Sequence, residues 1–333
     1  MMERILLSHG GGGEMTRELL RELFFREFGS NEASQDDAAQ LHVNTDIAFT
    51  TDSFVVSPLF FKGGDIGKLA VCGTINDICC AGATPRHLSC AMIIEEGFEI
   101  NQLKQIVRSM ADTAAENNVR IVTGDTKVVP KGTADGVYIN TSGIGEIIQG
   151  FSVSGQNASP GDAVLVSGPI GMHGCAILAA REHSLKSQDI RSDCASVLPL
   201  LLALKPFAEH VHVLRDPTRG GLAATLNEIA GQSAAGMLLH ETDIPINPEV
   251  LGLCAVTGID PMNLASEGRL IAVVEKEFSE KALEAWRATE AGKGSAIIGS
   301  IVTEHPVIVA LETETGGKRV LRMPSGELLP RIC

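Results

Sequence analysis

Acidic residues stand in short polar clusters at the ends of apolar segments in the first half of the chain. Hard cations such as Mg²⁺ prefer several carboxylate and water oxygens, and a bound phosphate often completes their coordination shell. Carboxylates that converge from separate segments on one cleft would form such a site, and Lys127 follows the last cluster closely. Taken singly, each aspartate is explained more simply as a turn former or a helix N-cap. The clusters are Asp36-Asp37, Thr51-Asp52-Ser53, Asn76-Asp77 and Gly124-Asp125-Thr126.

A run of four glycines precedes a predicted helix in the stretch SHGGGGEMT. Consecutive backbone N–H groups at such a position can bind a phosphate. The run lacks the GK[ST] ending of a Walker A loop, and no GxGxxG motif follows a predicted strand. A flexible linker therefore explains the run equally well. The glycines are Gly10, Gly11, Gly12 and Gly13.

The second half of the chain offers two further candidates. Glu267 stands beside a glycine at the entrance to a predicted strand, in NLASEGRLIAVV, where a charged residue has no obvious packing role. The stretch RDPTRGGLAATLNEIA places Asp216–Thr218 at a helix start and Gly220–Gly221 in its first turn. A helix cap with close packing explains this stretch as well as a functional site does. Three histidines near glycine or proline turns are interpreted as structural: His9, His87 and His173.

The eight cysteines include no CxxC pair, and no Cys/His spacing is typical of a zinc site. Most of them lie among aliphatic residues, where cysteine behaves as a small buried hydrophobe. Cys333 is the exception, because the sequence closes on it in the stretch ELLPRIC. An exposed terminal thiol is open to oxidation and disulfide exchange. We therefore expect this thiol to reach a place that only a chain end can enter.

Composition limits the class of protein. A chain of 333 residues is long enough for two domains, and 44% hydrophobic residues with only 4% aromatics and 35 glycines favour an α/β protein with tight turns. The formal charge of −14 argues against nucleic acid and anionic membranes as partners. No apolar run approaches the roughly 20 residues of a membrane span. The N-terminal residues lack the features of a signal peptide, so a cytoplasmic location is expected.

Hydrophobic periodicity predicts the elements that must position these residues. The Ser/Gly/Pro-rich stretch at 152–162 is the best candidate for a domain boundary. Helix–strand alternation follows it, beginning with a helix from residue 175. The elements predicted before this boundary are a helix over 14–28, a hairpin of two short strands around 44–46, a buried helix over 64–83, an amphipathic helix over 100–118, and strands over 120–129 and 136–147.

The motifs occur together in the order found in one known family. The stretches DDAA, TTDSFVVSPLFFKGGDIGKLAVCGTINDICCAGATP, VTGDTKVV, RDPTRGGLA, GIDPMNLASEGRL and PRIC resemble the HypE family of hydrogenase maturation factors. That family of carbamoyl dehydratases lies within the superfamily of aminoimidazole ribonucleotide synthetase, selenophosphate synthetase and thiamine-monophosphate kinase. The resemblance covers essentially the whole chain. The Asp pairs and the GD motif are superfamily features, whereas SEGR and PRIC are specific to HypE.

The resemblance implies a two-domain α/β (α+β) fold of the aminoimidazole ribonucleotide synthetase type. Residues 1–150 would form an ATP-binding domain whose strands complete a β-barrel across a homodimer. Residues 151–325 would form a C-terminal α/β domain, and 326–333 a mobile tail that carries the cysteine.

The resemblance also implies ATP and Mg²⁺ as cofactors. The implied metal ligands are Asp37, Asp52, Asp77 and Asp125. The residues implied to bind the nucleotide are Asp36, Asp37, Asn76 and Asp125, with the Gly10–Gly13 loop closing over it.

The implied reaction makes the protein's own tail the substrate. A carbamoyltransferase of the HypF type would load a carbamoyl group on Cys333. The protein would then dehydrate this group to a thiocyanate while ATP is converted to ADP and phosphate. The cyanide would pass to iron on the HypC–HypD complex and become a ligand of the [NiFe]-hydrogenase iron centre.

The chemistry of this reaction gives each candidate residue a task. A thiocarbamate does not lose water readily, because oxide is a poor leaving group. Transfer of the ATP γ-phosphate to the carbonyl oxygen forms an iminophosphate, and phosphate then leaves as the nitrile forms. Lys127 and the Mg²⁺ carboxylates would neutralise charge during this transfer. Glu267 is the candidate base that removes protons from nitrogen, helped if burial raises its pKa.

Three alternatives stay open on the residues alone. A selenophosphate synthetase would place a reactive Cys or selenocysteine in the N-terminal glycine loop, and SHGGGGEMT has none. Thiamine-monophosphate kinase or aminoimidazole ribonucleotide synthetase activity gives Cys333 no use. A non-catalytic carrier would present cysteine-bound cargo without ATP turnover.

Overall fold

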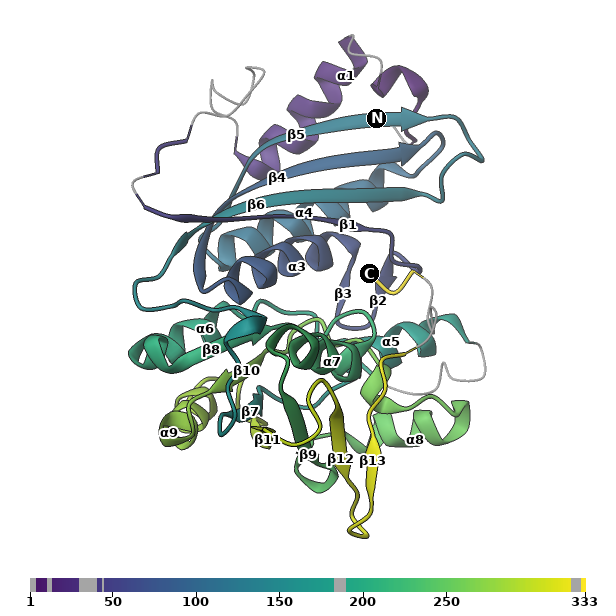
Figure 1. Cartoon of the computed structure of the whole chain (residues 1–333). Coiled ribbons are helices and arrows are strands. Elements are labelled where there is room, and N and C mark those ends of the chain that lie inside the picture. The colour runs from purple at the N-terminus through teal and green to yellow at the C-terminus, as the bar shows by residue number, and fades with distance from the viewer. Residues whose placement is uncertain (1–3, 11–13, 30–40, 44, 183–189, 325–330) are drawn as a thin grey trace.

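The computed structural model describes the whole chain apart from residues 1–3, 11–13, 30–40, 44, 183–189 and 325–330. Figure 1 shows one sheet with two helices beneath it, and a second group of helices between these and another sheet. The four-stranded sheet uses strands up to residue 147, and the seven-stranded sheet uses strands from residue 163 onward. The predicted two-domain α/β architecture is therefore confirmed. In the part of the chain with described coordinates, no helix is long and apolar enough to span a bilayer.

The first sheet has the strand order β1-β6-β4-β5. β6 pairs antiparallel with both neighbours, whereas β4 and β5 run parallel because a helix crosses over between them. Side chains point alternately to the two faces of a strand, so one face of this sheet packs on helices and the other is open. The strands are β1 (Ile47–Phe54), β4 (Ala83–Glu95), β5 (Arg120–Val129) and β6 (Val137–Ile147).

Two helices cover the inner face of this sheet, as predicted. α4 (Ile100–Glu116) is amphipathic and buries one stripe of apolar residues. α3 (Ile66–Cys80) is buried around nearly its whole circumference, because it lies between the sheet and the second domain. Its N-cap is Asp65, whose carboxylate accepts hydrogen bonds from the backbone N–H groups of Gly67 and Lys68. A helix so enclosed can present polar side chains to an interdomain cleft.

The N-terminal helical segment is confirmed and the predicted hairpin is wrong. The segment consists of α1 (Glu14–Leu19), a π-helical turn η2 (Leu20–Phe24) and α2 (Phe25–Phe28). Residues 41–43 form no strand, and β1 pairs along its full length with β6 instead. The alternating pattern of β1 is satisfied by this distant partner, which a local hairpin signal does not reveal.

The second sheet has the order β13-β12-β9-β11-β7-β10-β8. It is antiparallel except where β12 runs parallel to β9. Its central strands β7 and β10 are buried on both faces, which explains their continuous apolar sequence. The strands are β7 (Ala163–Val166), β8 (Val211–Arg215), β9 (Gly236–His240), β10 (Ile271–Val274), β11 (Ala296–Val302), β12 (Val309–Glu312) and β13 (Lys318–Val320).

Helices of the second domain lie on both sides of this sheet (Figure 1). α5 begins at Met172, three residues before the predicted start at residue 175. α6 contacts α3 and so joins the two domains. The helices are α5 (Met172–Arg181), α6 (Leu198–Leu204), α7 (Gly221–Ser233), α8 (Pro248–Thr257) and α9 (Lys276–Arg287).

Candidate active site

A polar cavity of about 400 Å³ lies between the two domains. Its walls come from β1 and α3 of the first domain and from the β8–α7 segment of the second. The cavity therefore exists only because the domains pack together. Its lining residues are Thr51, Asp52, Asp77, Cys80, Arg215, Asp216, Thr218, Arg219, Thr225 and Glu228.

Asp52 and Asp77 face this cavity together, as predicted for two of the metal ligands. Asp52 lies near the end of β1, and its carboxylate accepts a hydrogen bond of 2.8 Å from the N–H of Ser53. Asp77 lies in the last turn of α3 and accepts a 2.8 Å hydrogen bond from the Thr50 hydroxyl. Burial raises the pKa of both carboxyls, and the charge of Asp52 contributes to the raised pKa of Asp77.

Asp216 is a third carboxylate of this cavity, and the motif pattern alone did not assign it there. Burial, followed by the charge of Asp77, raises the pKa of Asp216 to about 7. A helix does start in this stretch, but Asp216 is not its cap. The N-cap of α7 is Gly220, in the left-handed region at φ 78°, and it makes no side-chain cap. Because the Asp216 carboxylate does not cap the helix, it faces the cavity alongside Arg219.

Glu267 is buried, with only 2% of its surface exposed. Its Oε1 atom has no hydrogen-bond partner among the described residues. Burial first, and then the charges of Asp216, Asp193 and Asp52, raise its pKa well above the ordinary value. The residue predicted as the base thus has an environment that favours the protonated carboxyl over the carboxylate.

The thiol of Cys333 lies in the same environment. Burial raises its pKa, and the charge of Glu267 is the next cause of the shift. The backbone of Arg331–Cys333 runs antiparallel to Val55–Ser57, since Val55 N–H donates to the Cys333 carbonyl at 3.1 Å and Ser57 N–H to the Arg331 carbonyl at 3.2 Å. The Arg331 guanidinium forms an ion pair with Asp135. The described end of the predicted tail is therefore seated in the cleft, and residues 326–330 lie outside the described residues.

Asp125 and Lys127 lie elsewhere. Both belong to β5, where their side chains form an ion pair at 3.6 Å. In the pairing register, Ser53 of β1 is aligned through β6 and β4 with Asp125 of β5. Asp125 and Ser53 therefore lie on the same, open face of the sheet. Asp52 is the neighbour of Ser53 in β1 and so points to the opposite face. β1 and β5 are also three strands apart, roughly 14 Å. Within one chain, Asp125 therefore lies away from Asp52 and Asp77, and the sharing of one ion by Asp77 and Asp125 stays a prediction.

Of the glycine run, only Gly10 belongs to the described residues. Gly10 ends the short helix η1 (Leu7–Gly10), which packs against β5. Gly10 thus belongs to a helix packed against β5, the strand that carries Asp125 and Lys127, at the opposite edge of the sheet from β1. The other predicted residues of this set lie outside the described residues: Gly11, Gly12, Gly13, Asp36 and Asp37.

Asn76 is a positioning residue in this structure, and its role in nucleotide binding stays a prediction. The side chain is fully buried. Its Nδ2 donates to the carbonyls of Ala195 at 3.1 Å and Glu267 at 3.3 Å, and its Oδ1 accepts from Val197 N–H at 2.9 Å. Since these contacts occupy the amide, Asn76 joins α3 to the loops of the second domain that carry Glu267.

The donor set suits a magnesium ion that arrives with a nucleotide. Among residues with described positions, no three histidine, cysteine, aspartate or glutamate side chains converge as a ready-made metal cage. Asp52 and Asp77 instead present hard carboxylate oxygens along an open cavity wall, and burial is the chief cause of their raised pKa values. Mg²⁺ commonly binds through one or two carboxylates and completes its shell with waters and phosphate oxygens. These residues fit that mode.

His173 was interpreted as structural, yet it contacts the tail directly. Its ring is fully buried, and Nε2 lies 2.8 Å from the carbonyl oxygen of Ile332. Nothing in the local sequence GMHG indicates this contact, because the partner is 159 residues away.

Six of the other cysteines are buried, as expected for small hydrophobes, and Cys80 is partly exposed.

Comparisons with known proteins agree with this geometry. The model of the AIR synthase related protein N-terminal domain matches residues 35–147, and that of the C-terminal domain matches 159–312. The chain is 46% identical to carbamoyl dehydratase HypE of Rhodobacter capsulatus, over 99% of this chain and 98% of the relative. It is 43% identical to carbamoyl dehydratase HypE of Escherichia coli K12, over the full length of both chains.

Solved structures give the same result. Hydrogenase maturation protein HypE in complex with ATP superposes with a TM-score of 0.93 at 45% identity, covering 98% of this chain and 99% of that one. A HypE–HypF complex matches with a TM-score of 0.82 at 48% identity, covering 92% and 99%. A thiamine-monophosphate kinase from Stenotrophomonas maltophilia, at 19% identity and a TM-score of 0.66, shares the fold alone. The chain belongs to the HypE family of carbamoyl dehydratases, which serve hydrogenase maturation and are built from the two AIR synthase related domains.

Proposed function

We propose that this protein uses ATP to dehydrate a carbamoyl group on Cys333 to a thiocyanate, the source of the cyanide ligand of [NiFe]-hydrogenase iron. The observation that carries the proposal is the docked position of Cys333 within the electrostatic influence of Glu267, a buried carboxyl whose Oε1 has no hydrogen-bond partner among the described residues. A thiol and a general base in one closed site are what this dehydration requires.

The residues of the chain take distinct parts in the reaction. Glu267 accepts a proton from the carbamoyl nitrogen, a role that its raised pKa favours once the base is ionised. Its carboxyl keeps free proton-binding capacity, because Oε1 is without a partner in the described structure. Removal of two protons from nitrogen and loss of the phosphorylated oxygen then convert the thiocarbamate to the nitrile and phosphate. Water is excluded from this step by the buried seat of the tail.

ATP is proposed to bind with its phosphates toward Asp52 and Asp77. These residues would hold the Mg²⁺ that, when bound, neutralises phosphate charge during transfer. Arg219, on the opposite wall of the cavity, supplies a cation for the same purpose. The chain's similarity to a HypE solved with ATP supports ATP as the nucleotide.

The site is proposed to be completed by a second copy of the chain. The open face of the first sheet carries exposed apolar side chains, with Phe49 exposed by 68% and Ile93 by 44%. Asp125 and Lys127 lie on this same face, and Ile93 pairs directly with Lys127. A barrel formed by two such sheets would cover the apolar residues. It would also bring the Asp125 and Lys127 pair of one copy toward the nucleotide of the other.

Two partners follow from the reaction. A HypF-type carbamoyltransferase would load Cys333, in keeping with the solved complex of a related HypE with HypF. The HypC–HypD complex would receive the cyanide. Because Cys333 is only partly exposed when docked, the tail would leave the cleft for both exchanges.

The mass of the C-terminal peptide tests the proposal. The protein is carbamoylated by HypF, incubated with or without ATP, and digested. We expect loss of the mass of one water from the peptide only when ATP is present. In Glu267→Gln the carbamoyl group should persist while ATP still binds, and the rate should fall at least 100-fold. A carbamoyl peptide that never loses water, in a protein that binds ATP and HypF, would identify the chain as a carrier.

A further inference from the structure

The cleft recognises the tail by its backbone. The Arg331 carbonyl accepts hydrogen bonds from Ser57 N–H and from the guanidinium of Arg181. The Ile332 carbonyl lies 2.8 Å from His173 Nε2, and the Cys333 carbonyl accepts from Val55 N–H. All three tail carbonyls are therefore bound, and the donors come from both domains.

His173 is held in one orientation by its second nitrogen. Nδ1 lies 2.8 Å from the Ser192 hydroxyl, which itself accepts a 3.0 Å hydrogen bond from Cys194 N–H. The hydroxyl hydrogen is thus available to Nδ1, and Nε2–H is left to donate to the Ile332 carbonyl. Burial lowers the pKa of His173, which keeps the ring in this neutral form. The ring also packs edge-on against Phe61, with centroids 5.4 Å apart.

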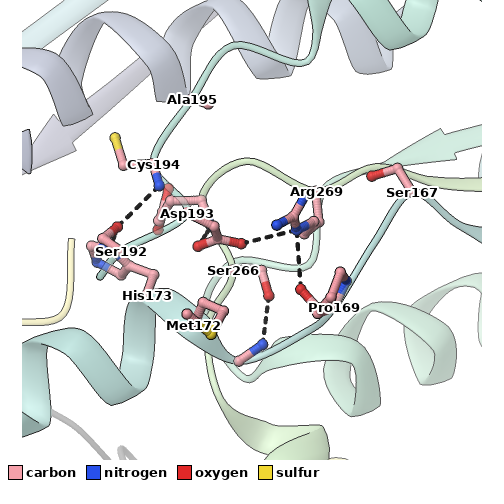
Figure 2. A network of polar contacts seen from close by, with 12 residues as sticks. Ser167, Pro169, Met172, His173, Ser192, Asp193, Cys194, Ala195, Ser266 and Arg269 are labelled. Carbon is pink, nitrogen blue, oxygen red and sulfur yellow. Dashed lines mark hydrogen bonds and ion pairs between the residues drawn. The ribbon is translucent and has the colours of Figure 1, made fainter. Parts of the chain in front are cut away.

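Asp193, the residue after Ser192, fixes the position of the proposed base, Glu267. Asp193 Oδ1 accepts a 3.1 Å hydrogen bond from the backbone N–H of Glu267. Its other oxygen lies 3.4 Å from Nε of Arg269, which donates to the Pro169 carbonyl at 3.0 Å. Figure 2 shows Ser192 joined to Cys194, and Asp193 joined to Arg269, within one short segment. A side chain at Gly268 would lie 2.0 Å from the Asp193 carbonyl, so the two segments are in close contact.

We propose that His173 and the Ser192–Asp193 turn form a latch that seats the tail and aligns the Cys333 cargo with Glu267. In this proposal, which rests on the proposed function, His173 and Ser192 are positioning residues. They fix the Ile332 carbonyl, one residue before the thiol. Asp193 fixes the backbone of Glu267 from the adjoining position, so one turn of chain sets the relative position of the tail and the base.

A latch of this kind suits a tail that must leave. Few hydrogen bonds hold the described tail residues, and each contributes a net stabilisation equivalent to roughly a 3- to 10-fold change in the docked population. The docked thiol is partly buried, and this burial raises its pKa, so it should react slowly with alkylating reagents. The alkylation rate of Cys333 therefore measures how often the latch opens, without ATP or a partner.

The experiment uses two replacements of His173 that differ in the position of their donor. The side-chain amide of His173→Gln reaches about as far as Nε2, so it keeps a donor for Ile332. The shorter amide of His173→Asn reaches only the position of Nδ1. Cys333 alkylation by iodoacetamide is followed by the mass of the C-terminal peptide in the full-length protein. We expect His173→Asn to speed alkylation about 3- to 10-fold and His173→Gln to stay within about 2-fold of wild type.

Matched variants separate the latch from general destabilisation. His212→Gln removes another histidine with both ring nitrogens engaged, by Asp162 and Glu275, away from the tail, and should leave alkylation unchanged. Ser192→Ala should speed alkylation in the same direction as His173→Asn and serves if that variant fails to fold. In the carbamoylated protein, His173→Asn should lower the rate of dehydration at saturating ATP and leave the KM for ATP unchanged.

Equal alkylation rates in wild type, His173→Asn and Ser192→Ala would overturn the latch. Equal acceleration by the Asn and Gln variants would also overturn it, because the position of the donor would then not matter. The alkylation arms involve neither ATP nor carbamoyl. A protein with an intact latch that never dehydrates its cargo would therefore refute the proposed function alone.

Discussion

Glu267 and Asp216 are carboxyl groups whose surroundings favour the protonated form. Both are shifted chiefly by burial, and the charges of neighbouring aspartates raise each pKa further. At pH values above its ordinary pKa, such a group lowers the free energy of unfolding. Groups of this kind recur at functional sites. The carboxyl groups of the cleft would therefore have a strong affinity for the cations that accompany a nucleotide.

Replacing Asp216 should stabilise the protein in a pH-dependent way. The folded state keeps the Asp216 proton up to about pH 7, whereas the unfolded chain loses it near its ordinary pKa of 3.8. Stability from this group is therefore complete below pH 4 and is lost as pH rises through 7. After allowance for solvent screening, Asp216→Asn should gain on the order of 1–3 kcal/mol at pH 8.5 relative to pH 4.

Urea unfolding of the ligand-free protein at the two pH values measures this gain. Asp243→Asn, at an exposed position of the second domain, is the matched control. An Asp216→Asn variant with the same gain at both pH values would show that Asp216 ionises normally in the folded protein.

The start of α7 is the element that brings Asp216 and Arg219 to the cavity. The chain turns sharply there, with Gly220 at φ 78° and Gly221 at φ 62°. A Cβ atom at Gly221 would lie 2.6 Å from the carbonyl oxygens of Met262 and Leu264. The turn therefore needs glycine for its backbone conformation and for its close approach to the segment before Glu267.

Two Gly-to-Ala substitutions in this helix should have opposite effects. Gly221→Ala should destabilise the protein by about 2 kcal/mol or more, since it adds strain at positive φ and a backbone clash. Gly231→Ala lies later in the same helix with no atom within 4 Å of the added Cβ. It should stabilise by up to about 1 kcal/mol through helix propensity. Urea midpoints of both variants test this, and two shifts of the same sign would contradict the close contact.

The whole molecule is arranged so that both domains contribute to one cleft. α3 carries Asp77 toward the cavity and Asn76 into the second domain, where its amide fixes the Glu267 loop. The tail bridges the domains again from the other end of the chain. A second copy on the open face of the first sheet would add Asp125 and Lys127, the predicted residues that lie outside this cleft.

Mixing two inactive variants tests that arrangement. If Asp77 and Asp125 act in one site from different copies, Asp77→Asn and Asp125→Asn homodimers should each be inactive. After exchange of subunits, half of the dimers are mixed and one of their two sites is intact, so activity should return to about a quarter of wild type. ATP-dependent dehydration of carbamoylated protein is the readout.

The control mixes Asp77→Asn with Asp52→Asn, which lie in the same cavity of one chain and should not complement. Absence of recovery in the first mixture, with subunit exchange verified, would show that Asp125 works independently of a second copy.

Local pattern was sufficient for much of this protein. The apolar stripe of α4, the enclosed apolar run of α3 and the strands β5 and β6 follow from periodicity, since each segment must bury a face set by its own geometry. A charged residue with no packing role, Glu267, and a thiol closing the sequence, Cys333, were recognisable because their types are unusual at such positions.

Tertiary structure decided which of these residues meet. β1 found its partner in β6 rather than in a hairpin, and that register sent Asp52 and Asp125 to opposite faces. In the sequence, Asn76 is one member of the polar pair Asn76-Asp77, and His173 is a histidine near a turn. In the structure, both bind backbone groups more than 100 residues away. Periodicity reports which face of a segment is buried. Only the packing of distant segments determines what lies against that face, because such contacts depend on register and on domain orientation, which no local pattern encodes.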